Sequence, residues 1–325
     1  MFRPSGEVFD EAVTYLQLSM WGLPAMLVIF AATGLLRGLQ NTVTPLWIAG
    51  IGFAGNALLN WAFIYGAGWG IAGSAAGTVV AQWGMVIAYA AIIARLAKKH
   101  GASSAPSRGG IRGTAATGGW LFLRTVALRV GLLLTVGAAT ALGTAELAGW
   151  QIVFTISSFA AFALDSLAIA AQALIGKHLG SGEEDSVRFV LRRTTAWGAA
   201  GGVVLGVIIA GLSPVLGVIF TGEWSMSWMT LPALILMGVL MPIAGIVYVL
   251  DGVLMGANDS RYLALAGAVN LVPFVIYLAI VLMAEPHGSW GLLFVAAGFF
   301  GVLMGMRWWT LSRRVKGDAW LGVPA

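Results

Sequence analysis

The chain of 325 residues contains no cysteine, and only 10% of its residues are charged. Without cysteine it can form neither a disulfide nor a thiolate nucleophile nor a thiolate metal site. Its histidines, His100, His178 and His287, fall in expected loops and do not form a zinc-ligand cluster. A phosphate-binding P-loop is also lacking, because Gly176 and Lys177 are followed by histidine and position 171 is alanine. With no nucleophile paired to a base either, the sequence argues against an enzyme.

Apolar residues are abundant instead. They make up 59% of the chain, and the mean hydropathy is +0.90, which is more than a soluble domain of this length could bury. A helix needs about 20 apolar residues to cross the bilayer hydrocarbon, and turn or charge clusters divide the chain into such stretches. We place them at 13–36, 45–65, 70–94, 120–142, 150–175, 196–220, 229–254, 262–283 and 289–311. The sequence therefore predicts an all-α integral membrane protein with nine transmembrane helices.

Basic residues are concentrated in alternate loops. The groups at 95–112, 177–193 and 307–316 share one side if the spans alternate, whereas Arg3 lies in a segment on the other side. By the positive-inside rule, the chain would be a multi-pass protein of the cytoplasmic membrane with its carboxyl terminus in the cytoplasm. The positive charge is thus a topology signal and does not indicate a nucleic-acid partner. The opening 13 residues are polar and acidic, unlike a cleavable signal peptide.

The stretch KKHGASSAPSRGGIRGTAATGG at 98–119 is rich in small and basic residues and predicts a flexible cytoplasmic linker. It would separate a partial amino-terminal lobe of three spans at 1–97 from a carboxyl-terminal lobe of six spans at 120–315. A cytoplasmic tail at 316–325 follows.

An internal repeat relates the two lobes. PAMLVIFAATGLLRGLQNT at 24–42 aligns without a gap with PIAGIVYVLDGVLMGANDS at 242–260, sharing a proline, both glycines of G-x-x-x-G and a leucine. Trp-Gly pairs at 69–70 and 290–291 precede the third and ninth spans in the same order. Parallel repeats are typical of transporters in which two bundles rock about a central site. The matched prolines Pro24 and Pro242 would bend their helices, as static kinks or during a transport cycle.

Several stretches resemble one family in its own order along the chain. They include AVTYLQLSMWGLPAML at 12–27, LLRGLQNTVTP at 35–45, LDSLAIAAQALIGKHLGSG at 164–182 and LDGVLMGANDSRYL at 250–263. These stretches resemble the multidrug and toxic compound extrusion (MATE) transporters, and within them the DinF-like branch. The resemblance implies a twelve-helix fold in two six-helix lobes, of which this chain would supply the fourth to twelfth helices. The MATE-like fold would thus be truncated at its amino terminus.

The resemblance also implies a function. It indicates secondary antiport, in which organic, often cationic, compounds are exported in exchange for protons or sodium ions without a cofactor. Asn60 stands where some DinF-like relatives have an aspartate, and the helix that carries an acidic coupling residue in many relatives is not present. Two alternatives stay open: a lipid-linked flippase of the same superfamily, or a non-transporting fragment or subunit that needs a separate three-helix amino-terminal segment. The expected partners are the lipid bilayer and small organic substrates.

Ionisable residues inside spans are candidate site residues, because burying them in a bilayer is costly. The sequence has four: Arg124, Arg129, Asp165 and Asp251. Equal depth predicts that Arg129 pairs with Asp165 about 14 Å into the membrane, and Arg124 with Asp251 about 6 Å in. The deeper pair is either a permanent structural contact or leaves Asp165 to titrate or bind a cation, modulated by Arg129. The shallower pair is interpreted as mainly structural.

Polar residues form two further patterns. Gln151, Ser158, Asp165 and Gln172 recur every seven residues and so lie on one face of the fifth span, toward a cavity or a neighbouring helix. Asn56 and Asn60 form a shorter face in the second span, expected mainly to hold helices together.

Small and aromatic residues complete the predictions. Glycines spaced four apart are expected at helix contacts: Gly34/Gly38, Gly73/Gly77, Gly202/Gly206, Gly252/Gly256 and Gly301/Gly305. Tryptophans near span ends, Trp150 among them, are expected at the membrane interface.

Overall fold

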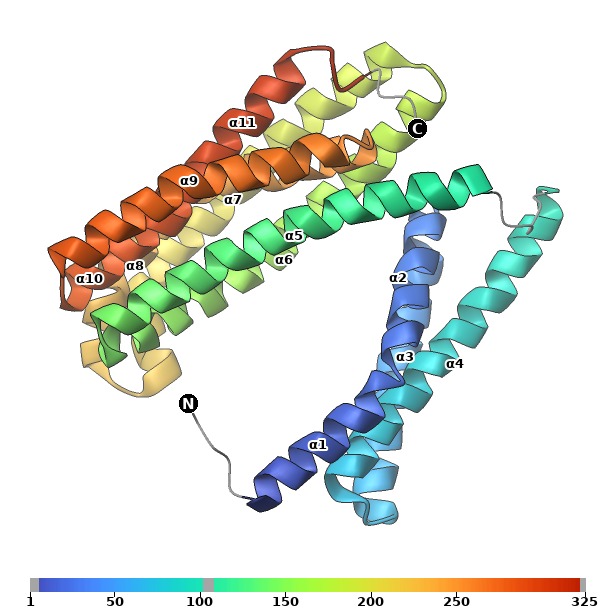
Figure 1. The fold of residues 1–325 in the computed structure, drawn as a ribbon, viewed down its shortest axis with the longest axis horizontal. Coiled ribbons are helices and arrows are strands. Elements are labelled where there is room, and N and C mark those ends of the chain that lie inside the picture. Colours follow the sequence, from blue (N-terminus) through green and yellow to red (C-terminus); the bar gives the residue numbers. More distant parts are fainter. Residues whose placement is uncertain (1–5, 102–107, 322–325) are drawn as a thin grey trace. The chain divides into compact units, whose positions relative to one another are not determined.

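The computed structural model describes residues 6–101 and 108–321, which are helical over most of their length and contain no β-strand (Figure 1). The chain divides into two compact units, residues 1–106 and 107–325.

The first unit consists of four α-helices: α1 (Gly6–Met20), α2 (Leu23–Gly38), α3 (Val43–Trp61) and α4 (Gly70–Lys99). A π-helical turn, η1 (Ala62–Gly66), extends α3. Helix α4 packs against the other three. The buried Tyr89 of α4 contacts α2 through a hydrogen bond of 3.0 Å between its hydroxyl and that of Thr33.

The first expected span is bent. It consists of α1 and α2, which meet at 44° across Trp21 and Gly22. Pro24 is the second residue of α2, a position where the missing N–H of proline costs no helical hydrogen bond. The indole Nε1 of Trp83 donates to the Trp21 carbonyl at 3.1 Å and so satisfies one backbone acceptor at the break. Pro242, which aligns with Pro24 in the internal repeat, lies instead inside the uninterrupted helix α8.

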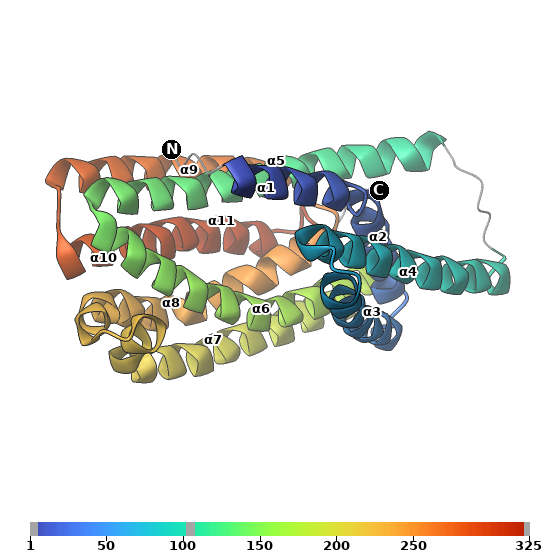
Figure 2. The ribbon, with the colours of Figure 1, turned by 90° about the horizontal axis from the view of Figure 1, so that it is seen from below.

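The second unit consists of long helices that run alongside one another (Figures 1 and 2). They are α5 (Arg108–Leu142), α6 (Thr144–Gly180), α7 (Glu184–Thr221), α8 (Trp224–Gly256) and α9 (Ser260–Ala284). The last helix is composed of α10 (Gly288–Ala296), a π-helical segment η2 (Ala297–Leu303) and α11 (Met304–Lys316). Helix α8 packs against α6, α7, α10 and α11, and it is the most buried candidate span of the described residues.

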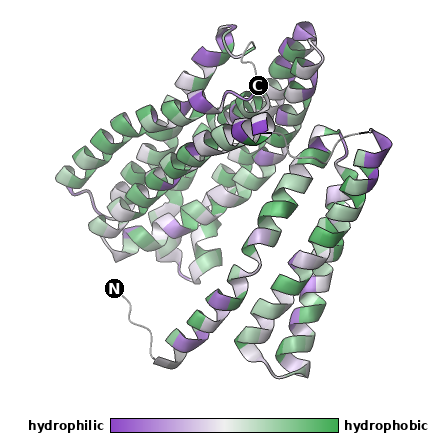
Figure 3. Ribbon diagram, turned by 45° about the vertical axis from the view of Figure 1, so that its right-hand side comes forward, coloured by the Kyte–Doolittle hydropathy of each residue, from purple (hydrophilic) through white to green (hydrophobic). Residues whose placement is uncertain are grey.

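Eight described helices are long and apolar enough to cross a bilayer, and a ninth is added if α1 and α2 form one span. Figure 3 shows hydrophobic residues along the helices and hydrophilic ones gathered toward several helix ends. The chain is therefore an all-helical, multi-pass membrane protein.

The predicted linker at 98–119 is wrong over much of its length. Residues 98–99 end α4, and residues 108–119 form the first turns of α5; residues 102–107 lie outside the described part. The five glycines of this segment disfavour a helix, but extending an existing helix costs less than starting one. With 35 residues, α5 is about 52 Å long and exceeds the hydrocarbon thickness of about 30 Å.

The internal repeat is present in the backbone hydrogen bonds. After α2, the N–H groups of Leu39, Gln40 and Asn41 donate to the carbonyls of Leu35, Arg37 and Leu36, respectively. After α8, the N–H groups of Ala257, Asn258 and Asp259 donate to the carbonyls of Val253, Met255 and Leu254, respectively. These partners match one to one at the offset of the sequence repeat. Gln40 and Asn258 both adopt a left-handed conformation, with φ of 61° and 60°. The two stretches thus end their helices in the same way.

Most of the predicted glycine contacts are confirmed. A Cβ atom at Gly202 or Gly206 would collide with the α8 backbone, and one at Gly252 or Gly256 with the α6 backbone. In the same manner, Gly77 of α4 approaches the end of α3, and Gly73 approaches Phe63 of η1. In contrast, Gly34, Gly38 and Gly305 have open space around them.

Candidate functional site

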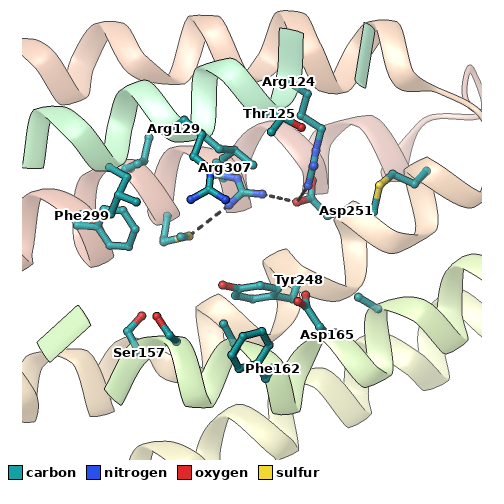
Figure 4. Close-up of a pocket in the computed structure, with 18 of the residues that line it drawn as sticks. Arg124, Thr125, Arg129, Ser157, Phe162, Asp165, Tyr248, Asp251, Phe299 and Arg307 are labelled. Atoms are coloured by element: carbon teal, nitrogen blue, oxygen red, sulfur yellow. Dashed lines mark hydrogen bonds and ion pairs between the residues drawn. The ribbon is translucent and has the colours of Figure 1, made fainter. Parts of the chain in front are cut away.

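A cavity of about 620 Å³ lies inside the second unit, among α5, α6, α8 and the last helix. Figure 4 shows its charged and aromatic lining. Helix α5 contributes Arg124 and Arg129; α6 contributes Phe154, Ser157, Ser158, Phe162, Asp165 and Gln172; α8 contributes Tyr248 and Asp251; and the last helix contributes Phe299 and Arg307. Its volume falls in the range of about 300–1,000 Å³ that is usual for small-molecule sites.

Asp251 holds together a cluster of three charges, which we call the Asp251 cluster (Asp251, Arg124 and Arg307). Arg124 Nη2 donates to Asp251 Oδ2 at 2.5 Å, and Arg307 Nη2 donates to the same oxygen. Asp251 and Arg307 are both buried. The predicted pair of Arg124 and Asp251 is therefore confirmed, and Arg307 is a third member that the sequence did not predict.

Arg307 was missed because it lies near the end of the last expected span and was grouped with the cytoplasmic basic residues. In the structure α11 continues to Lys316, which leaves Arg307 more than two turns inside the helix. Its position within the 289–311 stretch was the available signal.

The predicted pair of Arg129 and Asp165 is wrong. Both residues line the cavity, but no ion pair joins either of them to another described residue. In Figure 4, Asp165 lies on the α6 side, across the cavity from the arginines. The depth estimate placed the start of the fourth span at 120, whereas α5 begins at Arg108, and equal depth does not fix the direction in which two helices face.

The predicted polar face of α6 (Gln151, Ser158, Asp165 and Gln172) is directed toward the cavity over most of its length. Ser158, Asp165 and Gln172 line the cavity, whereas Gln151, two turns before Ser158, is exposed elsewhere. Tyr248, three residues before Asp251 and so on the same face of α8, adds a hydroxyl to the cavity lining.

Trp150 supports the aromatic part of the wall. Its ring contacts Phe154 and Phe299, both of which line the cavity, with ring centroids 6.3 and 5.6 Å away. Trp150 is fully buried, so the prediction that it lies at the membrane interface is wrong. The reason is that α6 already begins at Thr144 and turns Trp150 toward η2.

The two asparagines of the first unit contact each other, and neither is among the residues that line the cavity. Asn60 Nδ2 donates to Asn56 Oδ1 at 3.0 Å, and Gly77 of α4 packs directly on Asn60. This contact between α3 and α4 agrees with the expected packing role.

Together these observations define a class: a polytopic helical membrane protein with a repeated helix ending and a charged, aromatic-lined internal cavity. The MatE family model matches residues 1–62 and 122–281, and the chain belongs to this MATE family.

The known relatives are longer than this chain. Protein DETOXIFICATION 44, chloroplastic, of Arabidopsis thaliana is 30% identical over 281 residues, which cover 86% of this chain and 53% of the relative. DNA damage-inducible protein F of Escherichia coli is 24% identical over 319 residues, which cover 94% and 67%. The chain thus spans about half the length of the curated plant relatives it matches.

Solved structures share the fold. The Vibrio cholerae MATE transporter VcmN in its bent form superposes with a TM-score of 0.83 at 18% identity, covering 98% of this chain and 73% of that one. An outward-facing multidrug resistance MATE family transporter gives a TM-score of 0.82 at 16% identity, covering 98% and 72%.

Proposed function

We propose that this protein is a secondary antiporter that exports organic compounds across the cytoplasmic membrane in exchange for protons or sodium ions. The observation that carries the proposal is the different state of the two cavity aspartates. Asp251 is neutralised by two arginines, whereas Asp165 faces the same cavity without an ion-pair partner among the described residues. An unpaired carboxylate within a membrane span is a natural site for a coupling ion.

The membrane arrangement follows from the same sequence signals. We count the bent pair α1 and α2 as one span, which gives nine spans, three in the first unit and six in the second. The basic loops then lie in the cytoplasm together with the carboxyl terminus. A flippase for lipid-linked substrates is less well supported, because Asp251 already neutralises part of the positive charge of the cavity.

The test is gradient-driven transport by Asp165→Asn. Everted vesicles containing the chain would be given an organic dye, and its accumulation measured while a proton or sodium gradient is imposed and then collapsed with an ionophore. We expect the variant to lose accumulation by at least about tenfold, which is within the usual range of coupling free energies.

The matched control is Asp318→Asn. The Asp318 side chain is exposed and pairs with Arg188, and neither residue lines the cavity, so its loss should leave accumulation unchanged. Accumulation by Asp165→Asn with an unaltered pH dependence would refute the coupling role. If neither gradient drives accumulation by the unmodified chain, the antiporter proposal is wrong.

A further inference from the structure

The cavity keeps two unpaired charges of opposite sign after the Asp251 cluster is accounted for. Arg129 on α5 and Asp165 on α6 both line it, and neither has an ion-pair partner in the described part of the chain. Three arginines against two aspartates give the lining a formal charge of +1. Unpaired charges within membrane spans are costly, so a ligand that pairs with them is stabilised accordingly.

The three possible charge types of ligand differ in what they leave unpaired. A monocation would pair with Asp165, but it would leave Arg129 alone and raise the charge of the cavity to about +2 by simple counting. A monoanion would pair with Arg129 and leave Asp165 alone. A zwitterion pairs with both residues and adds no net charge.

The lining also specifies the body of the ligand. Phe162, Tyr248 and Phe299 present aromatic rings to the cavity (Figure 4), and such rings favour an aromatic partner. A guanidinium binds a carboxylate through two parallel hydrogen bonds. We propose that the cavity binds aromatic zwitterions of amino-acid type, with the ammonium group at Asp165 and the carboxylate at Arg129.

Transport of the zwitterion depends on the proposed antiport function, whereas its binding to the cavity does not. If Asp165 also takes the coupling ion, the ion and the ammonium group compete for one carboxylate, as exchange requires. Arg129 would hold the carboxylate throughout, and binding itself needs no gradient.

Three matched probes test the proposal: tryptophan, a zwitterion; tryptamine, which lacks the carboxylate; and indole-3-propionate, which lacks the ammonium group. Their binding to the purified chain in detergent would be measured by calorimetry at neutral pH. We expect tryptophan to bind at least about tenfold more tightly than either other probe, because each charge-assisted contact contributes at least that factor.

Variants of Arg129 and Asp165 then show which residue binds the carboxylate and which binds the ammonium group of the ligand. Arg129→Gln should weaken the binding of tryptophan to the level of tryptamine and should not weaken the binding of tryptamine, and Arg129→Lys should restore part of the loss. Asp165→Asn should weaken the binding of tryptophan to the level of indole-3-propionate. Arg192→Gln, which changes an exposed arginine outside the cavity, is the control and should alter none of the three.

Several results would overturn the proposal. They are equal binding of tryptamine and tryptophan, equal weakening of all three probes by Arg129→Gln, or no binding of any probe. Selective tryptophan binding without gradient-driven transport would leave this inference standing and refute the antiporter. Transport of a dye without charge-selective binding would do the reverse.

Discussion

Asp251 is the shared acceptor for the buried guanidinium group of Arg307 and the partly buried one of Arg124, so its charge matters more to stability than that of an exposed carboxylate. In Asp251→Asn the amide would leave Arg124 and Arg307 without a counter-charge inside the bundle. Removing one partner of a buried ion pair costs about 3–5 kcal/mol. We therefore expect a clear fall in the thermal unfolding midpoint of the purified protein.

A surface pair provides the comparison. Asp318→Asn removes the partner of Arg188. The Asp318 side chain is largely exposed, and exposed ion pairs contribute little to stability. Its unfolding midpoint should match that of the unmodified chain. Equal midpoints for Asp251→Asn and Asp318→Asn would show that the Asp251 cluster is not structurally important.

Glu183, in the connection between α6 and α7, gives a local pH dependence. A hydrogen bond from His178, with Nδ1 2.9 Å from Glu183 Oε2, and further ones from Ser186 and Ser181 hold the pKa of Glu183 below its ordinary value of 4.5. A lowered folded-state pKa stabilises the connection above the ordinary pKa, and this stabilisation is lost as the pH falls through the folded value.

Hydrogen exchange would detect this loss. After correction for intrinsic rates, the first turn of α7 should be less protected at about pH 3 than at about pH 6. Glu183→Gln should remove the difference between the two pH values, whereas Glu184→Gln should retain it. If Glu183→Gln behaves like the unmodified chain, the hydrogen bond to His178 does not control this connection.

The candidate site could be predicted residue by residue only in part. Arg124, Arg129, Asp165 and Asp251 stood out because ionisable residues are rare in apolar stretches. Which arginine meets which aspartate depends on where each helix begins and how it is rotated, and composition contains neither. The sequence therefore identified the charged residues of the cavity but paired Asp165 incorrectly.

At the scale of helices, the contact between α7 and α8 depends on glycine. A Cβ atom at Gly206 would meet the Gly238 carbonyl oxygen across the contact. Gly206→Ala should force the helices apart and destabilise the protein by about 1–3 kcal/mol, as overpacking does. Unfolding of the purified variant in detergent measures this.

Gly211, further along α7, is the matched control because nothing lies within 4 Å of a Cβ atom built there. Gly211→Ala should be neutral or stabilising by up to about 1 kcal/mol, since alanine has the higher helix propensity. Equal effects of the two substitutions would mean that the close approach seen at Gly206 does not contribute to stability.

The apolar centre of each helix was predictable, whereas its ends were not. Helices α5, α6 and α7 have 35, 37 and 38 residues, so they extend well beyond the stretches that hydropathy defines. Helical extensions of polar and small residues carry no hydropathy signal. The break at Trp21 and Gly22 was missed for the opposite reason, because the flanking residues are apolar on both sides.

For the whole molecule, the repeat was the most reliable sequence signal. It predicted that two distant helices end alike, and the matching hydrogen bonds after Gly38 and Gly256 confirm this. A repeat compares one part of the chain with another, so it does not depend on estimates of depth or helix length. The cavity, in contrast, is formed by four helices at once, and only the structure reveals it.

The proposed membrane topology can be tested directly because the chain contains no cysteine. A single cysteine introduced by substitution would be the sole thiol available to a membrane-impermeant maleimide. Ser181 between α6 and α7, Ser225 at the start of α8 and Ala319 after α11 are all exposed. With the basic loops in the cytoplasm, Ser225→Cys should react in intact cells. Ser181→Cys and Ala319→Cys should react only after the cells are permeabilised, and the opposite pattern would reverse the orientation.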